Sequence, residues 1–100
     1  MAMFDKMKAL LDMQKKMQEM KHELDNTDFE IQSSDGLVKI TMNGSQEVKE
    51  ISIKDDFKEI EKVNLEKAIK DAFNMAIKRS HDIAAEKMKD ITGLNLPGLI

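Results

Sequence analysis

At 100 residues the chain has the length of one domain, so we expect a single domain over residues 1–100. It contains no cysteine, which excludes disulfides and thiolate chemistry, and its net charge of -3 argues mildly against indiscriminate nucleic-acid binding. No apolar run approaches the roughly 18 residues of a membrane span. The first residues also lack the apolar core of a signal peptide, so we expect a cytoplasmic protein that does not bind membranes.

Residues 2–25 predict a long helix with an apolar seam. Met3, Leu10, Met17 and Leu24 recur every seven residues, as in a short coiled coil. The charges of this segment alternate in sign and cancel. A helix of this length would be about 36 Å long.

The middle of the chain predicts a three-stranded antiparallel meander. Asp35-Gly36 and Asn43-Gly44 bracket the central strand. Both dipeptides favour a type I′ turn, because Asn, Asp and Gly accept a positive φ with least strain. Between the turns, Val38, Ile40 and Met42 fall on one face of the strand, which we expect to face the core.

The third strand should run from about residue 46 to residue 53. Val48 is out of phase with Ile51 and Ile53 in the alternation of apolar and polar residues. One extra residue in the strand would restore the alternation, which predicts a β-bulge near residues 49–50.

The last third of the chain predicts a second long helix. An acidic connector over residues 55–61, in which we expect one helical turn, leads to Asn64 as the N-cap. The helix should reach about Ile91, with Gly93 at the C′ position. Residues 94–100 are apolar with turn residues, and we expect them to drape over a surface.

The two predicted helices are too long for a compact domain of this size. They would measure about 36 and 42 Å, whereas a compact 100-residue domain has a radius of gyration near 13 Å. Both helices would overhang the sheet, and uncovered apolar helix surface normally finds a partner. The sequence therefore predicts an α+β fold of order α-β-β-β-α that forms a homodimer by the helix seam, the sheet face or both.

The residue types needed for catalysis or metal binding are scarce. Ser80-His81-Asp82 has the composition of a hydrolytic triad, but neighbouring residues on a helix point about 100° apart and cannot converge. His22 and His81 are the only histidines in the sequence, and neither has a second ligand at metal spacing. We therefore expect no enzyme activity, no metal, no cofactor and no small-molecule substrate.

Basic residues on the two helices are the remaining functional candidates. Residues 26–63 carry nine acidic against five basic residues, so the helices are the less negative part of the chain. Lys and Arg bind DNA phosphates by charge alone, whereas a solvated face of mixed charge is the alternative interpretation. Arg79 is the one arginine in the sequence, so the chain has few side chains for bidentate hydrogen bonds to base edges.

Five segments resemble the YbaB/EbfC family of bacterial nucleoid-associated proteins. They are GLVKITMNG (residues 36–44), VKEISI (48–53), DAFNMA (71–76), MKDITGLNLPG (88–98) and MQKKMQEM (13–20). The resemblance covers nearly the whole chain in the expected order. The sequence departs from many relatives in lacking a Gly-rich start before the first helix.

The resemblance implies a tweezer-like homodimer, found in the nucleoid, that binds double-stranded DNA with little sequence preference and alters its conformation. It also implies roles in nucleoid organisation and gene regulation, without enzyme activity or cofactor. The alternative is a non-enzymatic adaptor whose Met-rich helix seam grips a partner helix. The family offers no invariant signature to carry over, so the DNA contacts are our interpretation from the implied tweezer arms. They are Lys8, Lys15, Lys16, Lys70, Lys78 and Arg79.

Overall fold

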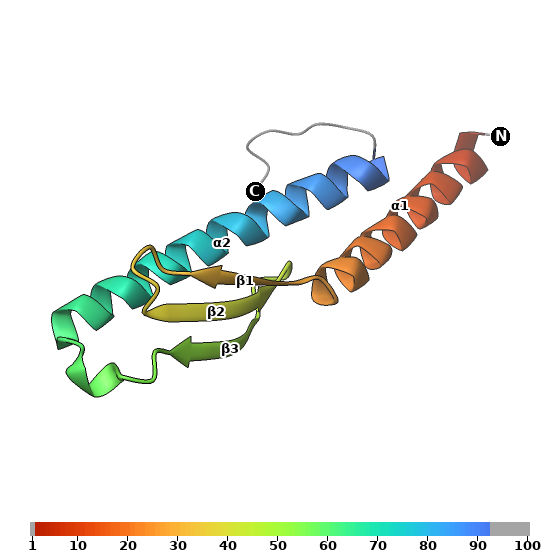
Figure 1. Ribbon diagram of the computed structural model, residues 1–100. Helices are drawn as coiled ribbons and strands as arrows, with labels where there is room; N and C mark the ends of the chain where they lie inside the picture. Colours follow the sequence, from red (N-terminus) through yellow and green to blue (C-terminus); the bar gives the residue numbers. More distant parts are fainter. Residues whose placement is uncertain (1, 93–100) are drawn as a thin grey trace.

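The computed structural model describes residues 2–92, and it has the predicted α-β-β-β-α order (Figure 1). The elements are α1 (Ala2–Asp25), β1 (Asp28–Gln32), β2 (Val38–Asn43), β3 (Val48–Ile53), the 3-10 turn η1 (Phe57–Glu59) and α2 (Lys62–Thr92). The sheet is antiparallel in the order β1-β2-β3, which confirms the predicted meander. The η1 turn lies in the acidic connector between β3 and α2, where the sequence predicts one helical turn.

The core lies between the sheet and α2. Figure 1 shows α2 crossing one face of the sheet and continuing beyond it, beside the C-terminal part of α1. The alanines of α2 let the helix backbone approach the strands closely, because their side chains add little width. The core cluster consists of Val38, Ile40 and Met42 of β2 with Ala68, Ala72 and Ala76 of α2.

Both hairpin turns differ from the type I′ turns that the sequence predicts. In the first, the Gly36 N–H donates to the Ser33 carbonyl at 2.9 Å, and Gly36 has a φ of 75°. In the second, the Gln46 N–H donates to the Asn43 carbonyl at 3.1 Å, and Gln46 has a φ of 64°. Each loop is therefore a β-turn that ends in a single left-handed residue, rather than a turn with two central residues at positive φ.

Gly44 is required for close packing and not for its φ. A Cβ atom at this position would lie 2.8 Å from Leu24 Cδ2, 3.2 Å from the Leu24 carbonyl oxygen and 3.3 Å from Ile83 Cγ2. The Gly44 N–H also donates to the carbonyls of Leu24 and Thr27, both at 3.0 Å. The end of α1, the β2–β3 turn and α2 thus meet at this glycine, a point that we call the junction.

The predicted β-bulge is present in β3. Thr41 pairs with Glu50 and Met42 with Val48, so Lys49 is the extra residue of the bulged strand. The bulge turns Val48 to the same face of the sheet as Met42, which is the face that carries the core.

On the core face of the sheet, β3 lies beyond the area that α2 covers. Ile51 pairs with Ile40 and Ile53 with Val38, so both isoleucines lie on the core face. Because α2 packs against β1 and β2, Val48, Ile51 and Ile53 stay 41%, 49% and 39% exposed. We call these three side chains the β3 shelf.

Asn64 is not the N-cap of α2, so that prediction is wrong. α2 begins at Lys62, and the Leu65 N–H donates to the Glu61 carbonyl at 3.0 Å, which places Asn64 inside the first turn. The helix reaches Thr92, close to the predicted end. The C′ position predicted for Gly93 and the predicted course of residues 94–100 lie outside the described residues.

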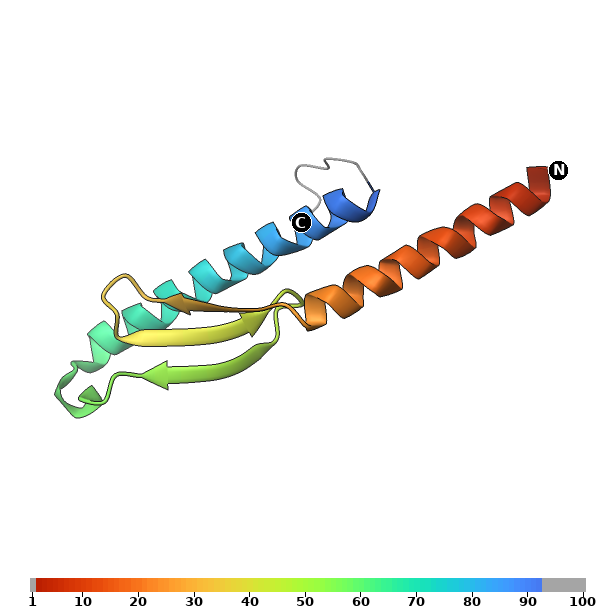
Figure 2. The ribbon, with the colours of Figure 1, turned by 45° about the vertical axis from the view of Figure 1, so that its right-hand side comes forward.

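The chain is elongated. Its principal extents are 70 × 22 × 16 Å and its radius of gyration is 18.7 Å, against about 13 Å for a compact chain of this length. Figure 2 shows α1 projecting away from the sheet along its whole length. The overhang expected from the helix lengths is confirmed for both helices, since α2 also continues beyond the sheet (Figure 1).

Candidate nucleic-acid interface

α1 forms a projecting arm that is held at its C-terminal end. Every side chain from Phe4 to Glu19 is exposed, whereas Leu24 is 7% exposed in the junction. Glu23 also forms an ion pair with Lys87 of α2 at 3.6 Å. We refer to residues 4–19 as the arm.

The three lysines predicted on α1 lie on the arm, and all three are exposed. Lys8 and Lys15 are seven residues apart, so they share one side of the helix, with Lys16 about 100° further round. Met17 lies about 180° from Lys8 by the same arithmetic. The basic side of the arm is therefore opposite to part of its methionine seam.

The three basic residues predicted on α2 do not form one patch. Lys70 and Lys78 are exposed, and they lie about 160° and 120° round the helix from the buried Ala72. Arg79 is also exposed, but it lies only about 20° from Ala72, near the line of side chains that faces the sheet. Lys70 and Lys78 thus belong to the outer side of α2, and Arg79 to a different side.

Lys67 is a basic residue of the outer side that was not among the predicted DNA contacts. It lies eleven residues before Lys78, which brings the two within about 20° of each other round the helix. A recess of about 310 Å³ is lined by Lys67, Lys70, Asp71 and Asn74. Residues 67, 70, 74 and 78 follow one another at spacings of three and four. This helical spacing is the signal that could have placed Lys67 on the same side of α2 as Lys70 and Lys78.

None of the six predicted contact residues has an acidic partner between residues 2 and 92. Over this range, the ion pairs within 4.0 Å involve Lys21, Lys62 and Lys87 only. The charged groups of the six candidates are consequently available to an external anion. Other exposed lysines share this property, so it does not by itself separate an interface from a solvated face.

Two carboxylates are committed to turns. The hydrogen bond from Ser45 Oγ, followed by the bond from Lys21, lowers the pKa of Asp25 below its usual value. The hydrogen bond from Ser33 Oγ, at 2.6 Å, lowers the pKa of Asp35. Asp35 also accepts from the Leu37 N–H at 3.1 Å, and neither carboxylate lies on the arm.

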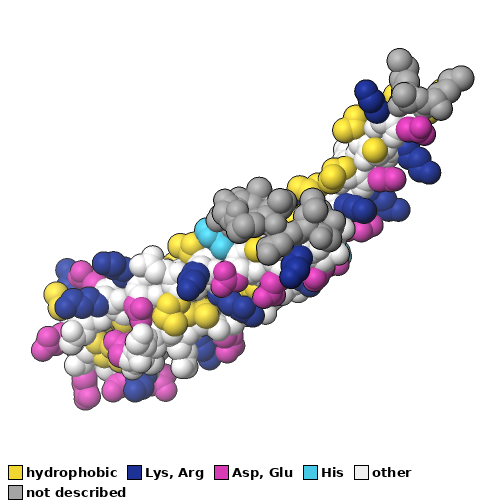
Figure 3. Space-filling view, turned by 90° about the horizontal axis from the view of Figure 1, so that it is seen from above, with side chains coloured by type: hydrophobic (Ala, Val, Ile, Leu, Met, Phe, Trp, Pro, Cys, Tyr) yellow, Lys and Arg dark blue, Asp and Glu magenta, His cyan; other side chains and the backbone are white. Residues whose placement is uncertain are grey.

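Charge is mixed over the visible surface. In the face seen in Figure 3, Lys and Arg side chains are interspersed with Asp and Glu along the elongated body. α2 has seven basic against five acidic residues, whereas the connector and strands are acidic. The arrangement offers scattered phosphate contacts, which suit binding without base-specific readout.

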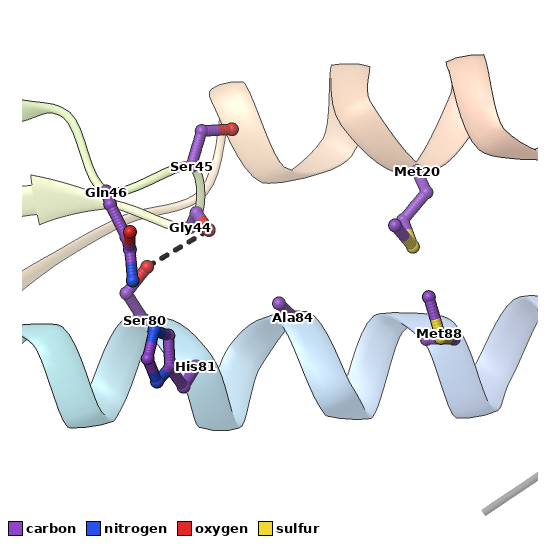
Figure 4. Close-up of a pocket in the computed structure, with 8 residues that line it drawn as sticks. All are labelled: Met20, Gly44, Ser45, Gln46, Ser80, His81, Ala84 and Met88. Atoms are coloured by element: carbon purple, nitrogen blue, oxygen red, sulfur yellow. Dashed lines mark hydrogen bonds between the residues drawn. The ribbon is translucent and has the colours of Figure 1, made fainter. Parts of the chain in front are cut away.

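A cleft of about 380 Å³ separates α2 from the end of α1 (Figure 4). Met20 and Met88 point toward each other across it, with Ala84 further along the α2 wall. At its inner end, Ser80 Oγ donates to the Gly44 carbonyl at 3.0 Å. The hydroxyl of the Ser80-His81-Asp82 sequence is thus buried and bonded to the main chain, as a structural group would be.

Neither helix, over the residues that the structure describes, has a stretch long and apolar enough to cross a membrane.

Comparison with known proteins agrees with this geometry. Residues 1–95 match the YbaB/EbfC DNA-binding family, which confirms the resemblance found in the sequence. The fold is similar to the crystal structure of uncharacterized protein HP0035 from Helicobacter pylori. The TM-score is 0.65 and the sequence identity 25%, over 87% of this chain and 99% of that chain. Since the family match spans nearly the whole sequence, this chain belongs to the YbaB/EbfC family of DNA-binding, nucleoid-associated proteins.

Proposed function

We propose that this protein is a homodimer that binds double-stranded DNA with little sequence preference and alters its conformation. It would act in the bacterial nucleoid, in nucleoid organisation and gene regulation, as a non-enzymatic protein without a cofactor. The observation that carries the proposal is the projecting arm, which presents the exposed Lys8, Lys15 and Lys16 beyond the sheet (Figure 2).

The arm suits phosphate contact in its dimensions. Lys8 to Lys16 spans about 12 Å along the helix axis. Duplex DNA carries one negative charge per roughly 1.7 Å of its axis, or about seven over that length. The three lysines therefore have more phosphates within their span than they can neutralise. They can contact DNA at many positions along the duplex, which favours binding without sequence preference.

The β3 shelf supports the homodimer. β3 is an edge strand with an open row of backbone N–H and C=O groups, and edge strands of this kind readily pair with another chain. The shelf adds exposed side chains that continue the subunit core. We propose that the shelves of two copies face each other and hold the arms apart.

The adaptor hypothesis keeps one specific observation in its favour. Phe4, Leu10 and Leu11 of the arm are 72%, 71% and 60% exposed, which is unusual for large apolar side chains. Under that hypothesis the apolar side of the arm binds a partner helix, and DNA binding is absent.

A gel-shift series against salt separates the two hypotheses. Lys15→Ala/Lys16→Ala should weaken binding to a long random-sequence duplex. It should also reduce the slope of log K against log salt by roughly 1 for each phosphate that is no longer neutralised. The matched control is Lys54→Ala/Lys58→Ala, which removes the same charge from exposed positions off the helices that carry the candidates.

The control should retain the salt slope of the unmodified protein. Equal weakening in the two variants would show that only net charge matters and would remove the arm from the interface. No shift at low salt with the unmodified protein would defeat the DNA proposal itself.

A further inference from the structure

Asn43-Gly44 is the one asparagine–glycine pair in the sequence, and this pair is prone to loss of the asparagine amide. The backbone nitrogen of the residue after an asparagine can attack the side-chain Cγ atom, which closes a succinimide ring and expels ammonia. Glycine permits this attack best, because it has no side chain to block the approach and its backbone turns freely. Water then opens the ring at either carbonyl and leaves aspartate or isoaspartate.

The fold holds the groups that this reaction uses. The nucleophile is the Gly44 nitrogen, and its N–H donates to the carbonyls of Leu24 and Thr27. The leaving group is Asn43 Nδ2, which donates to the Asp25 carbonyl at 3.2 Å. The attack requires the Gly44 N–H to lose its proton and the Asn43 amide nitrogen to leave as ammonia. Both sets of hydrogen bonds must therefore break before the ring can close.

The end of α1 supplies the contacts that close this site. Leu24 and Asp25 are the last two residues of α1, and Thr27 lies in the link to β1. Asn43 and Gly44 are both buried against them. The Leu24 side chain also lies 2.8 Å from the position that a Cβ atom of Gly44 would take, which leaves no free space beside the nucleophile. The site opens when the end of α1 leaves the junction.

The product of the reaction does not fit the closed junction. An aspartate at position 43 has an oxygen in place of Nδ2. That oxygen would face the Asp25 carbonyl and the Glu47 carboxylate without a proton to donate. Isoaspartate routes the main chain through the side-chain carbon and lengthens it by one methylene, which displaces Gly44 from its contact with Leu24.

We propose that Asn43 is a deamidation site that the junction protects, and that its modification makes opening of the junction permanent. In the closed junction the Gly44 nitrogen keeps its proton and the amide stays intact. Once the end of α1 has left, the Gly44 nitrogen gives its proton to solvent, forms a bond to Cγ and releases Nδ2 as ammonia. Water then hydrolyses the ring. Chemical modification of the opened state is a general route to irreversible unfolding. The proposal does not depend on DNA binding.

Mass spectrometry of the full chain tests the protection, because replacement of the amide NH2 by OH raises the mass and peptide mapping locates the change. The chain is incubated at one mildly alkaline pH and one temperature, with and without denaturing guanidinium chloride. We expect Asn43 to react at least a hundredfold more slowly in the folded chain, because modification of an opened state follows the fraction of open molecules. A difference of less than tenfold would overturn the proposal.

Asn74 is the internal control for the chemistry in the unfolded chain. Met75 follows it, so a side chain hinders the attack that Gly44 permits at Asn43. In guanidinium chloride, Asn74 should react at least tenfold more slowly than Asn43. Equal rates at the two asparagines would overturn the assignment of Asn43 as the reactive site.

Leu24→Ala tests whether the end of α1 is the part that closes the site. It removes the side chain that packs against Gly44, and it should raise the rate at Asn43 in the absence of denaturant at least tenfold. The matched control is Leu10→Ala, which removes the same atoms at a 71% exposed position of α1 and should leave the rate unchanged. Equal rates in the two variants would overturn the role of the junction. The comparison of the folded and unfolded unmodified chain holds even if Leu24→Ala fails to fold.

Discussion

Asn43 joins the C-terminal end of α1 to the β2–β3 turn through four hydrogen bonds of one side chain. Its Nδ2 donates to the Asp25 carbonyl at 3.2 Å and to Glu47 Oε1 at 2.9 Å. Its Oδ1 accepts from the backbone N–H groups of Ser45 at 3.0 Å and Glu47 at 2.9 Å. The residue is fully buried, at 0% exposure.

Asn43→Ala should therefore be strongly destabilising. It leaves three backbone groups without their partner, and each missing bond costs about 1 kcal/mol net. The Glu47 carboxylate is exposed and can bind water instead, so it adds little to the cost. The expected decrease in the free energy of unfolding is about 3 kcal/mol, or about 12–24 °C in Tm for a domain of this size.

Urea denaturation followed by far-UV circular dichroism measures this decrease, at one fixed protein concentration because association shifts apparent stability. The control is Asn74→Ala at an exposed position of α2, which should change stability by less than about 0.5 kcal/mol. Asn43→Asp keeps the acceptor oxygen but places a buried carboxylate oxygen against the Asp25 carbonyl and the Glu47 carboxylate, so it should destabilise at least as much as Asn43→Ala. A decrease below about 1 kcal/mol in Asn43→Ala would refute the role given to this side chain.

The turns and the shelf give three further predictions. Gln46→Gly should raise stability by about 0.5–1 kcal/mol in thermal denaturation, because a left-handed φ costs a non-glycine residue about 1–2 kcal/mol and glycine returns part of that as chain entropy. The pKa of Asp35 is lowered in the folded state, so its contribution is complete above the unfolded value near 3.8 and is lost as the pH falls through the folded value. Acid titration of Asp35→Asn should accordingly show a smaller loss of stability below about pH 4. Ile51→Asp should give the mass of one chain by sedimentation, whereas Ser52→Asp on the opposite face of β3 should leave the association state unchanged, and a dimer in both variants would contradict the shelf assignment.

Periodicity was sufficient to predict the helices, the strands and the bulge, because burial selects apolar residues at fixed spacings. Turn geometry was not predictable in the same way. The Asn43-Gly44 pair has the composition of a type I′ turn, yet Gly44 is needed where Leu24 and Ile83 approach, and Gln46 takes the left-handed angle. A close approach between elements distant in sequence leaves no local signal.

The candidate interface was also only partly predictable from the sequence. Exposure of the lysines could be predicted from their charge alone. Their grouping could not, because it depends on which side of α2 the sheet covers. Arg79 lies toward that side, and Lys67 joins Lys78 on the other.

The attachment of α1 at one end makes it a lever. Its packing at Gly44 and Leu24 is tight, with 2.8 Å available where a Cβ would need more. A tilt of 10° at that end moves the far end of a 24-residue helix by about 6 Å. A small change in side-chain volume at the junction would therefore produce a much larger displacement of Lys8. In the proposed homodimer, the separation of the two arms would therefore depend on packing at a site that lies outside the proposed DNA contacts.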